Sequence, residues 1–169
     1  MIAFQEVRST SDRTKRSMRG VLERGGMIAA PPYGYRIDWT KSEPGLGHEG
    51  ARWAIDPVES GVVQEIFAMR RSGRSVNSIA RELNARGLLP PQASQAKGQP
   101  FWRGASISRM VCNSIYKGEF SYGGSAWTRH LAKKRRKKLE VKVFSRPHFR
   151  LVSDELWSAC NPERKEERV

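Results

Sequence analysis

The 169-residue sequence contains no apolar run near the roughly 18 residues that a membrane-spanning helix needs. Its first residues, from Met1 to Glu6, also lack the apolar core of a secretory signal peptide. These absences argue against a helical membrane protein and against secretion. We therefore expect a cytoplasmic protein with no membrane partner.

Cysteine and histidine are scarce. Cys112 and Cys160 lie far apart and form no C-x-x-C pair, which argues against a disulfide framework and a zinc ribbon. The histidines, His48, His130 and His148, show none of the paired spacing that metal sites use. We therefore expect no metal and no cofactor, and we expect both thiols to lie in or near the core.

Acidic residues are few relative to basic ones. The chain has 31 lysines and arginines against 17 aspartates and glutamates, a net charge of +14 at pH 7. This excess favours an anionic polymer as the partner, bound through salt-sensitive electrostatics, but it does not distinguish DNA from RNA. The 38% hydrophobic content is enough for one medium domain or two small ones.

Three short amphipathic segments lie in the middle of the chain. The first starts after Asp56, with Glu59 three residues later as in a capping box, and ends before Gly73. The second covers residues 75–87, and the third covers residues 105–113. Apolar residues recur at i, i+3 and i+4 in each, so the pattern predicts a helix-turn-helix core.

The third segment has a polar outer face beside its apolar inner one. Arginine can bind guanine through two hydrogen bonds and serine can donate or accept, so this face suits the major groove of DNA. The alternative is an ordinary three-helix core in which the arginines and serines of this face are simply exposed to solvent. The candidate base-contacting residues are Arg103, Ser106, Ser108 and Arg109.

The N-terminal 25 residues favour a helix, but their apolar residues are too unevenly spaced to bury a stripe. We expect a solitary basic helix along phosphates that ends at Gly25-Gly26; a frayed or disordered tail is the alternative. Strand periodicity then follows at Tyr35, Ile37 and Trp39 and again over residues 52–55, which predicts a two-stranded ribbon. Tyr33 and Tyr35 could stack on bases, although core packing is their commoner role.

The C-terminal part alternates between strand patterns and charge. Residues 115–123 and 141–144 predict two further strands. The chain from Arg129 to Lys142 is strongly basic and forms either an arm along a DNA backbone or a solvated loop. Ser153 is expected to cap a last helix, and residues 163–169 to extend as a linker helix. The expected fold class is α+β, mainly helical, with a helix-turn-helix-like three-helix core and a small antiparallel β ribbon.

Several motifs follow one another in a specific order. They are Glu23-Arg24-Gly25-Gly26, Pro31-Pro32-Tyr33-Gly34-Tyr35, Ile55-Asp56-Pro57, Ser78-Ile79-Ala80-Arg81-Glu82-Leu83-Asn84 with Arg86-Gly87, Trp102, Ser106-Ile107-Ser108-Arg109-Met110-Val111, Tyr116-Lys117-Gly118 and Leu151-Val152-Ser153-Asp154-Glu155-Leu156-Trp157. Each is weak alone, but their order resembles the recombinase domain of large serine recombinases of the phage-integrase and transposon type. The resemblance covers nearly the whole chain.

The resemblance implies a separate role for each part of the chain. Residues 1–25 would be the end of the helix that leaves a catalytic domain and crosses the minor groove, and residues 26–125 the DNA-binding recombinase domain. Residues 126–148 would be a basic flexible arm, and residues 149–169 a C-terminal helix and linker. The implied partner is double-stranded DNA, bound as an attachment half-site by a dimer or tetramer of the full-length recombinase.

In that family a serine of an N-terminal resolvase-like domain attacks a DNA phosphate. No serine of this sequence lies in a matching motif, and the family's cysteine-paired zinc ribbon is missing, so we carry over no catalytic residue and expect no catalysis by this chain. The expected phosphate-contacting residues are Lys15, Arg16, Arg19, Arg74, Ser75, Asn77, Lys133, Lys134, Arg135, Arg136, Lys137 and Lys138. Lys117 is a further expected DNA-binding residue.

Two other functions fit the same residues. A stand-alone regulator could use a helix-turn-helix to occupy an operator without recombination. A basic RNA-binding protein would use the Arg-Lys run together with Tyr33, Tyr35 and Trp39.

Overall fold

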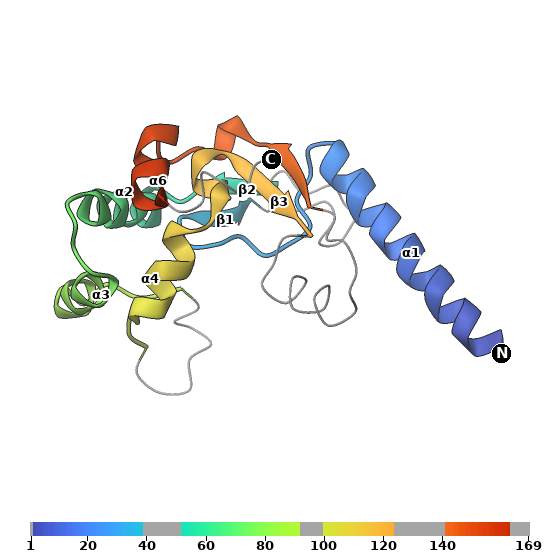
Figure 1. The fold of residues 1–169 in the computed structure, drawn as a ribbon, viewed down its shortest axis with the longest axis horizontal. Coiled ribbons are helices and arrows are strands. Elements are labelled where there is room, and N and C mark those ends of the chain that lie inside the picture. Colours follow the sequence, from blue (N-terminus) through green and yellow to red (C-terminus); the bar gives the residue numbers. More distant parts are fainter. Residues whose placement is uncertain (1, 39–51, 92–99, 124–140, 163–169) are drawn as a thin grey trace. The chain divides into compact units, whose positions relative to one another are not determined.

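The computed structural model describes residues 2–38, 52–91, 100–123 and 141–162, with only the backbone for residues 2–12. The fold is α+β and mainly helical, as the sequence predicts (Figure 1). In chain order the elements are α1 (Ile2–Glu23), β1 (Tyr35–Asp38), β2 (Arg52–Ile55), α2 (Pro57–Arg71), α3 (Val76–Ala85), α4 (Gly104–Val111), the 3₁₀ turn η4 (Ser114–Lys117), β3 (Glu119–Tyr122), β4 (Lys142–Ser145), the 3₁₀ turn η5 (Pro147–Phe149) and α6 (Asp154–Cys160).

The chain groups into two compact units, which are described separately. The first comprises residues 1–31 and 36–54, and the second comprises residues 32–35 and 55–169. The first unit therefore contains α1 and most of the β1–β2 ribbon. The second contains α2 to α6 with β3 and β4, so the C-terminal helix belongs to the same unit as the helical core.

In the first unit, α1 ends where glycine allows the backbone to turn. Gly25 has a positive φ of 89°, and the Gly26 amide donates to the Val21 carbonyl oxygen over 2.9 Å. The side chains from residue 13 to residue 18 are exposed, whereas Val21 and Leu22 are buried. The predicted helix and its end at Gly25-Gly26 are therefore present in the structure.

In the second unit, α2 begins at the predicted cap. Asp56 accepts hydrogen bonds from the amides of Val58 and Glu59, each over 3.0 Å. The capping-box expectation for Glu59 is wrong, because its Oε2 accepts from the Gly34 amide over 2.8 Å. The Asp56 amide donates instead to the Gly34 carbonyl oxygen over 3.0 Å. The cap thus ties the turn at Gly34 to the start of α2.

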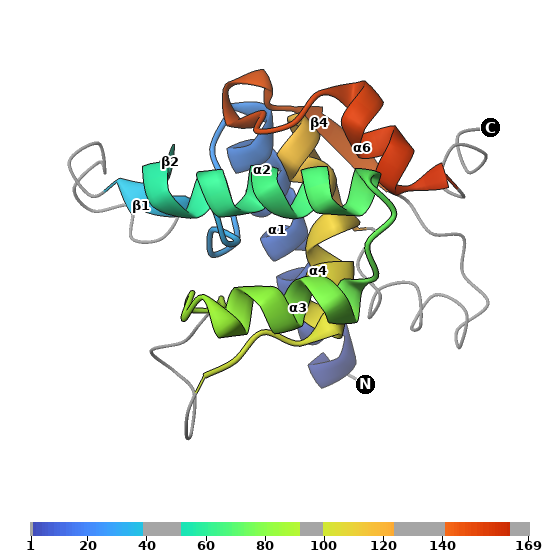
Figure 2. The same cartoon turned by 90° about the vertical axis from the view of Figure 1, so that its left-hand side faces the viewer.

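Helices α2, α3 and α4 form the predicted three-helix core, and α6 covers α2 (Figure 2). The Cys160 thiol lies 3.5 Å from the Phe67 carbonyl oxygen, and Asn161 Nδ2 donates to the Val111 carbonyl oxygen over 3.0 Å. These contacts join α6 to both α2 and α4. The buried apolar residues of the three core helices are Val62, Val63, Ile66, Phe67, Met69, Ile79, Ala80, Leu83, Ile107, Met110 and Val111.

Buried tyrosines hold the turn before α2 against the rest of the second unit. The Tyr35 hydroxyl donates to the Phe149 carbonyl oxygen over 2.6 Å, and the Tyr116 hydroxyl donates to the Tyr33 carbonyl oxygen over 2.8 Å. Burial raises the pKa of Tyr35 and of Tyr116. Burial, helped by the charges of Glu59 and Asp56, raises the pKa of Tyr33 to about 12. Tyr35 is therefore a core residue and not a platform for bases.

The strand predicted over residues 115–123 is only partly correct. Asn113 accepts from the Ile115 amide over 3.2 Å and starts the 3₁₀ turn η4, which ends at Gly118 with a positive φ of 85°. The strand begins only at Glu119, and β3 pairs antiparallel with β4, with Phe120 opposite Phe144. Ser153 caps α6, as predicted, by accepting from the Leu156 amide over 3.2 Å.

Alanine substitution of two glycines in the second unit tests this packing, because opposite changes in the free energy of unfolding are expected. Gly34 has a φ of +95°, and an added Cβ would lie 3.1 Å from Val63 Cγ2 and 3.2 Å from Leu151 Cδ1. Gly34→Ala is therefore expected to lower the free energy of unfolding by about 1–2 kcal/mol or more. Gly61 lies inside α2 with nothing within 4 Å of an added Cβ, so Gly61→Ala should raise it by about 0.5–1 kcal/mol. Urea denaturation of both variants measures the difference, and equal effects would contradict the described packing.

Candidate nucleic-acid interface

The outer face of α4 carries the polar residues that the sequence places there. Ile107, Met110 and Val111 are buried, whereas Ser108 and Arg109 are exposed and Ser106 is half-buried. Among the described residues, no carboxylate pairs with Arg109. Hydroxyl and guanidinium groups on this face are therefore available to a ligand outside the protein.

Trp102 fixes the segment that leads into α4. Its amide donates to Asn84 Oδ1 over 2.7 Å, and its carbonyl oxygen accepts from Asn84 Nδ2 over 3.0 Å. Its indole Nε1 donates to the Leu88 carbonyl oxygen over 2.9 Å, and the side chain is only 1% exposed. Asn84 thus binds both backbone groups of one residue, which sets where α4 begins relative to α3.

The start of α4 lies against the start of α3. A Cβ added at Gly104 would lie 2.0 Å from Asn77 Oδ1, so the absence of a side chain at residue 104 allows this close approach. Arg103, the residue before the helix, makes no side-chain cap hydrogen bond. Amides in the first turn of such a helix attract anions, including phosphate.

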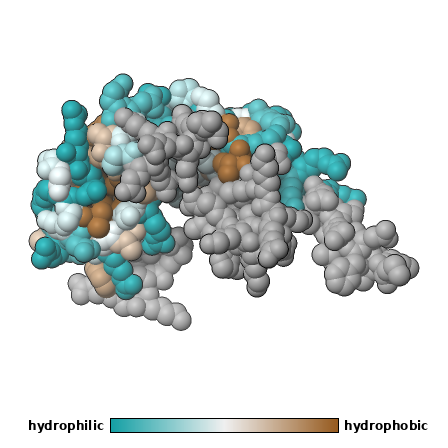
Figure 3. Space-filling model, viewed as in Figure 1, coloured by the Kyte–Doolittle hydropathy of each residue, from teal (hydrophilic) through white to brown (hydrophobic). Residues whose placement is uncertain are grey.

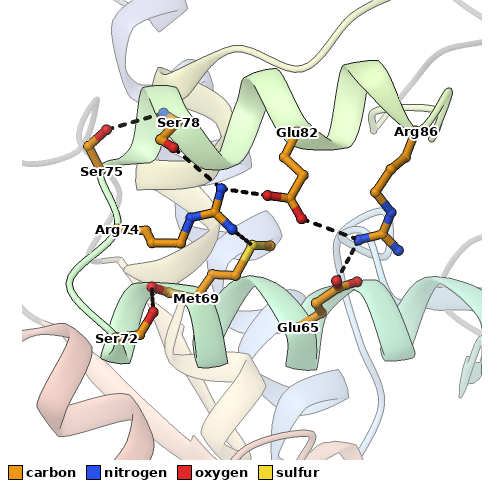
Figure 4. Close-up of polar contacts among 8 residues, drawn as sticks. All are labelled: Glu65, Met69, Ser72, Arg74, Ser75, Ser78, Glu82 and Arg86. Atoms are coloured by element: carbon orange, nitrogen blue, oxygen red, sulfur yellow. Dashed lines mark hydrogen bonds and ion pairs between the residues drawn. The ribbon is translucent and has the colours of Figure 1, made fainter.

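Arg74, an expected phosphate contact, lies in an ion-pair network between α2 and α3 (Figure 4). Its Nη2 lies 2.5 Å from Glu82 Oε2, and its Nη1 lies 3.1 Å from the sulfur of Met69. Glu82 also lies 3.9 Å from Arg86 Nη1, which contacts Glu65 Oε1 over 2.5 Å. Hydrogen bonding to Glu65 raises the pKa of Arg86. A phosphate at Arg74 would therefore have to compete with Glu82.

Ser75 and Asn77, two further expected phosphate contacts, lie at the start of α3. Ser75 caps the helix by accepting from the Ser78 amide over 3.1 Å, and its side chain is exposed. Asn77 is also exposed and borders Gly104, as described above. The structure therefore brings these two residues close to the start of α4.

The structure corrects the expectation for Lys117. This side chain is buried, with its Nζ 2.8 Å from Glu119 Oε2 and 4.8 Å from the centroid of the Trp157 ring. The alternation that placed Lys117 on an outer face assumed a strand, whereas the residue lies in the 3₁₀ turn η4. Its ammonium group is used inside the second unit, and we remove Lys117 from the set of DNA contacts.

The remaining expected contacts lie elsewhere. Lys15 and Arg16 are exposed and Arg19 is half-exposed on α1, which belongs to the first unit. The run Lys133, Lys134, Arg135, Arg136, Lys137 and Lys138 lies outside the described residues. Its assignment therefore rests on charge alone.

Arg81 is a candidate that the sequence analysis did not include. It is exposed on α3, four residues after Asn77 and three before Asn84, so it shares their side of the helix. Asn77 and Asn84 both contact the segment around Trp102 and Gly104. The spacing of Arg81 from Asn77 could have indicated this side of α3. The role of Asn84 had no local indication, because its partner is 18 residues away.

The surface of the described residues is mostly hydrophilic in the view of Figure 3, with small hydrophobic areas between. In the described ranges, no helix is both long and apolar enough to span a membrane. No group of three or more His, Cys, Asp or Glu residues there is placed to hold a metal ion.

Comparison with known proteins adds one finding. A family model described as Recombinase matches residues 57–167, about two thirds of the chain. The matched range contains the three core helices, the β3–β4 pair and α6. No curated protein and no solved structure matches the chain.

The Asn84 contact predicts a stability difference between two asparagines of α3. Asn84→Ala removes one acceptor and one donor for the Trp102 backbone and should lower the free energy of unfolding by about 1–2 kcal/mol. Asn77→Ala is the matched control, because no hydrogen bond of its exposed side chain is recorded in the described structure. It should change stability by less than about 0.5 kcal/mol. Chemical denaturation measures both, and equal losses would contradict the assigned role of Asn84.

Proposed function

Because the chain belongs to the Recombinase family, in which a role in DNA recombination is shared, we propose that it is the DNA-binding module of a site-specific serine recombinase. In this proposal it binds one half of an attachment site on duplex DNA. Strand cleavage is assigned to a resolvase-like catalytic domain of the full recombinase, which would act as a dimer or tetramer on cytoplasmic DNA.

The exposed polar face of α4 is the single observation that supports this proposal most strongly. Ser108 and Arg109 point outward while three apolar residues of the same short helix are buried. A helix of this kind can lie in the major groove, where base edges offer the acceptors that arginine and serine need. We assign base contacts chiefly to Arg109, Ser108 and Ser106.

Phosphate contacts are assigned to side chains that flank this helix. Asn77 and Arg81 lie on the side of α3 that holds the start of α4, and Ser75 precedes them. Such contacts position a protein on the duplex without selecting a sequence. Lys15, Arg16 and Arg19 of α1 and the basic run 133–138 would add salt-dependent affinity, as the net charge of +14 favours.

Selection of bound sequences from a random duplex pool tests the proposed function. A specific module should enrich a motif of roughly ten base pairs or more, at a salt concentration where nonspecific binding is weak. Competition with single-stranded RNA of the same length controls for a general polyanion binder. Absence of an enriched motif, or preference for the RNA, would contradict the proposal.

Substitution of Arg109 tests the assignment of α4 as the base-contacting helix. Arg109→Ala should weaken binding to the enriched duplex by about 1–3 kcal/mol and have little effect on a scrambled duplex. Lys134→Ala, which removes a charge from the basic run, should weaken both complexes alike. Fluorescence anisotropy titrations give the four affinities. If Arg109→Ala lowers the affinity for both duplexes equally, Arg109 does not contact bases.

A further inference from the structure

Phe101 and Arg103 form an exposed pair immediately before α4. The backbone at Arg103 is extended, with φ −117° and ψ 147°, so alternate side chains point to opposite sides. Trp102 points inward and is 1% exposed, whereas Phe101 is 53% exposed and Arg103 is exposed. The Arg103 guanidinium carbon lies 4.8 Å from the centroid of the Phe101 ring. The two side chains thus meet in a cation–π contact on the outer side of the segment.

This pair is held by a rigid backbone. Asn84 and Leu88 bind Trp102 through three hydrogen bonds of 2.7 to 3.0 Å. A phenylalanine ring has two rotatable side-chain bonds, and a cation over its face restricts the many rotamers of arginine. The position of the Arg103 guanidinium is therefore largely set before any ligand binds.

The direction of Arg103 argues against the base contact expected from the sequence. The guanidinium lies over the ring of Phe101, which precedes α4 in the chain, whereas Ser108 and Arg109 lie in the second turn of the helix. No carboxylate among the described residues pairs with it. A guanidinium that is held by a side chain outside the helix, and not on the outer face of its second turn, can reach the backbone phosphates that flank the groove.

We propose that Arg103 binds a backbone phosphate of duplex DNA at the groove rim and that Phe101 is the positioning residue that orients it. This inference rests on the proposed function, because it takes α4 as the helix in the groove. The guanidinium donates N–H groups to phosphate oxygens, and the ring face holds its other side. Phe101 itself does not contact the DNA.

One substitution, Arg103→Ala, measured on two duplexes, tests the phosphate contact. Arg103→Ala should weaken binding by the same factor on the enriched and the scrambled duplex. It should also reduce the slope of log K against log salt by about 0.9, the value for one phosphate contact. A loss confined to the enriched duplex would show a base contact and overturn this part of the proposal.

Three variants test the role of Phe101. Phe101→Leu keeps an apolar side chain but removes the ring. It should lower the affinity for both duplexes by about two- to fivefold, the value of an exposed cation–π contact. Phe101→Tyr keeps the ring face and should bind like the parent chain. In an Arg103→Ala background, Phe101→Leu should cause no further loss. An equal loss in that background would show that Phe101 contacts DNA directly and would overturn its positioning role.

The outcomes separate this inference from the proposed function. If the parent chain selects a duplex motif but Arg103→Ala and Phe101→Leu bind like it, only the inference fails. If the parent chain selects no motif, the proposed function fails, while the Arg103 phosphate contact can still be measured on a duplex of arbitrary sequence. Thermal unfolding of each variant should match the parent, because both side chains are exposed.

Discussion

The position of α4 depends on the contact between Asn84 and the backbone of Trp102. α4 has eight residues, too few for a stable helix in isolation, so its geometry must come from tertiary contacts. Burial of Ile107, Met110 and Val111 supplies the attraction, and the Asn84 amide fixes where the helix begins. Loss of this contact would leave the start of α4 less firmly fixed relative to α3.

Some of the cations that contribute to the net charge are paired with groups of the protein itself. Arg74 and Arg86 share Glu82 in a network between α2 and α3, and Lys117 is buried against Glu119 and Trp157. These cations stabilise the fold and leave α3 and α4 with a small number of exposed arginines. In our proposal the small number of exposed arginines favours specific binding, because cations held by carboxylates add less to binding that is independent of sequence.

The parts of the structure that depend on local chemistry could be predicted from the sequence. Asp56 and Ser153 cap the helices that they were expected to cap, and the apolar stripes are buried as their spacing predicts. The contacts of Glu59, Arg74 and Asn84 could not be predicted, since each joins elements whose relative placement the sequence pattern does not specify. The error at Lys117 has the same origin, because a strand was assumed where Asn113 and Gly118 impose a 3₁₀ turn.

The central claim is that α4 contacts base edges in the major groove, and dimethyl sulfate interference on the enriched duplex tests it directly. This reagent methylates guanine N7 in the major groove, the acceptor that Arg109 would use together with O6. The account predicts that methylation of at least one guanine prevents binding of the parent chain and that Arg109→Ala is insensitive to it. Binding that tolerates N7 methylation at every guanine of the motif would contradict the account.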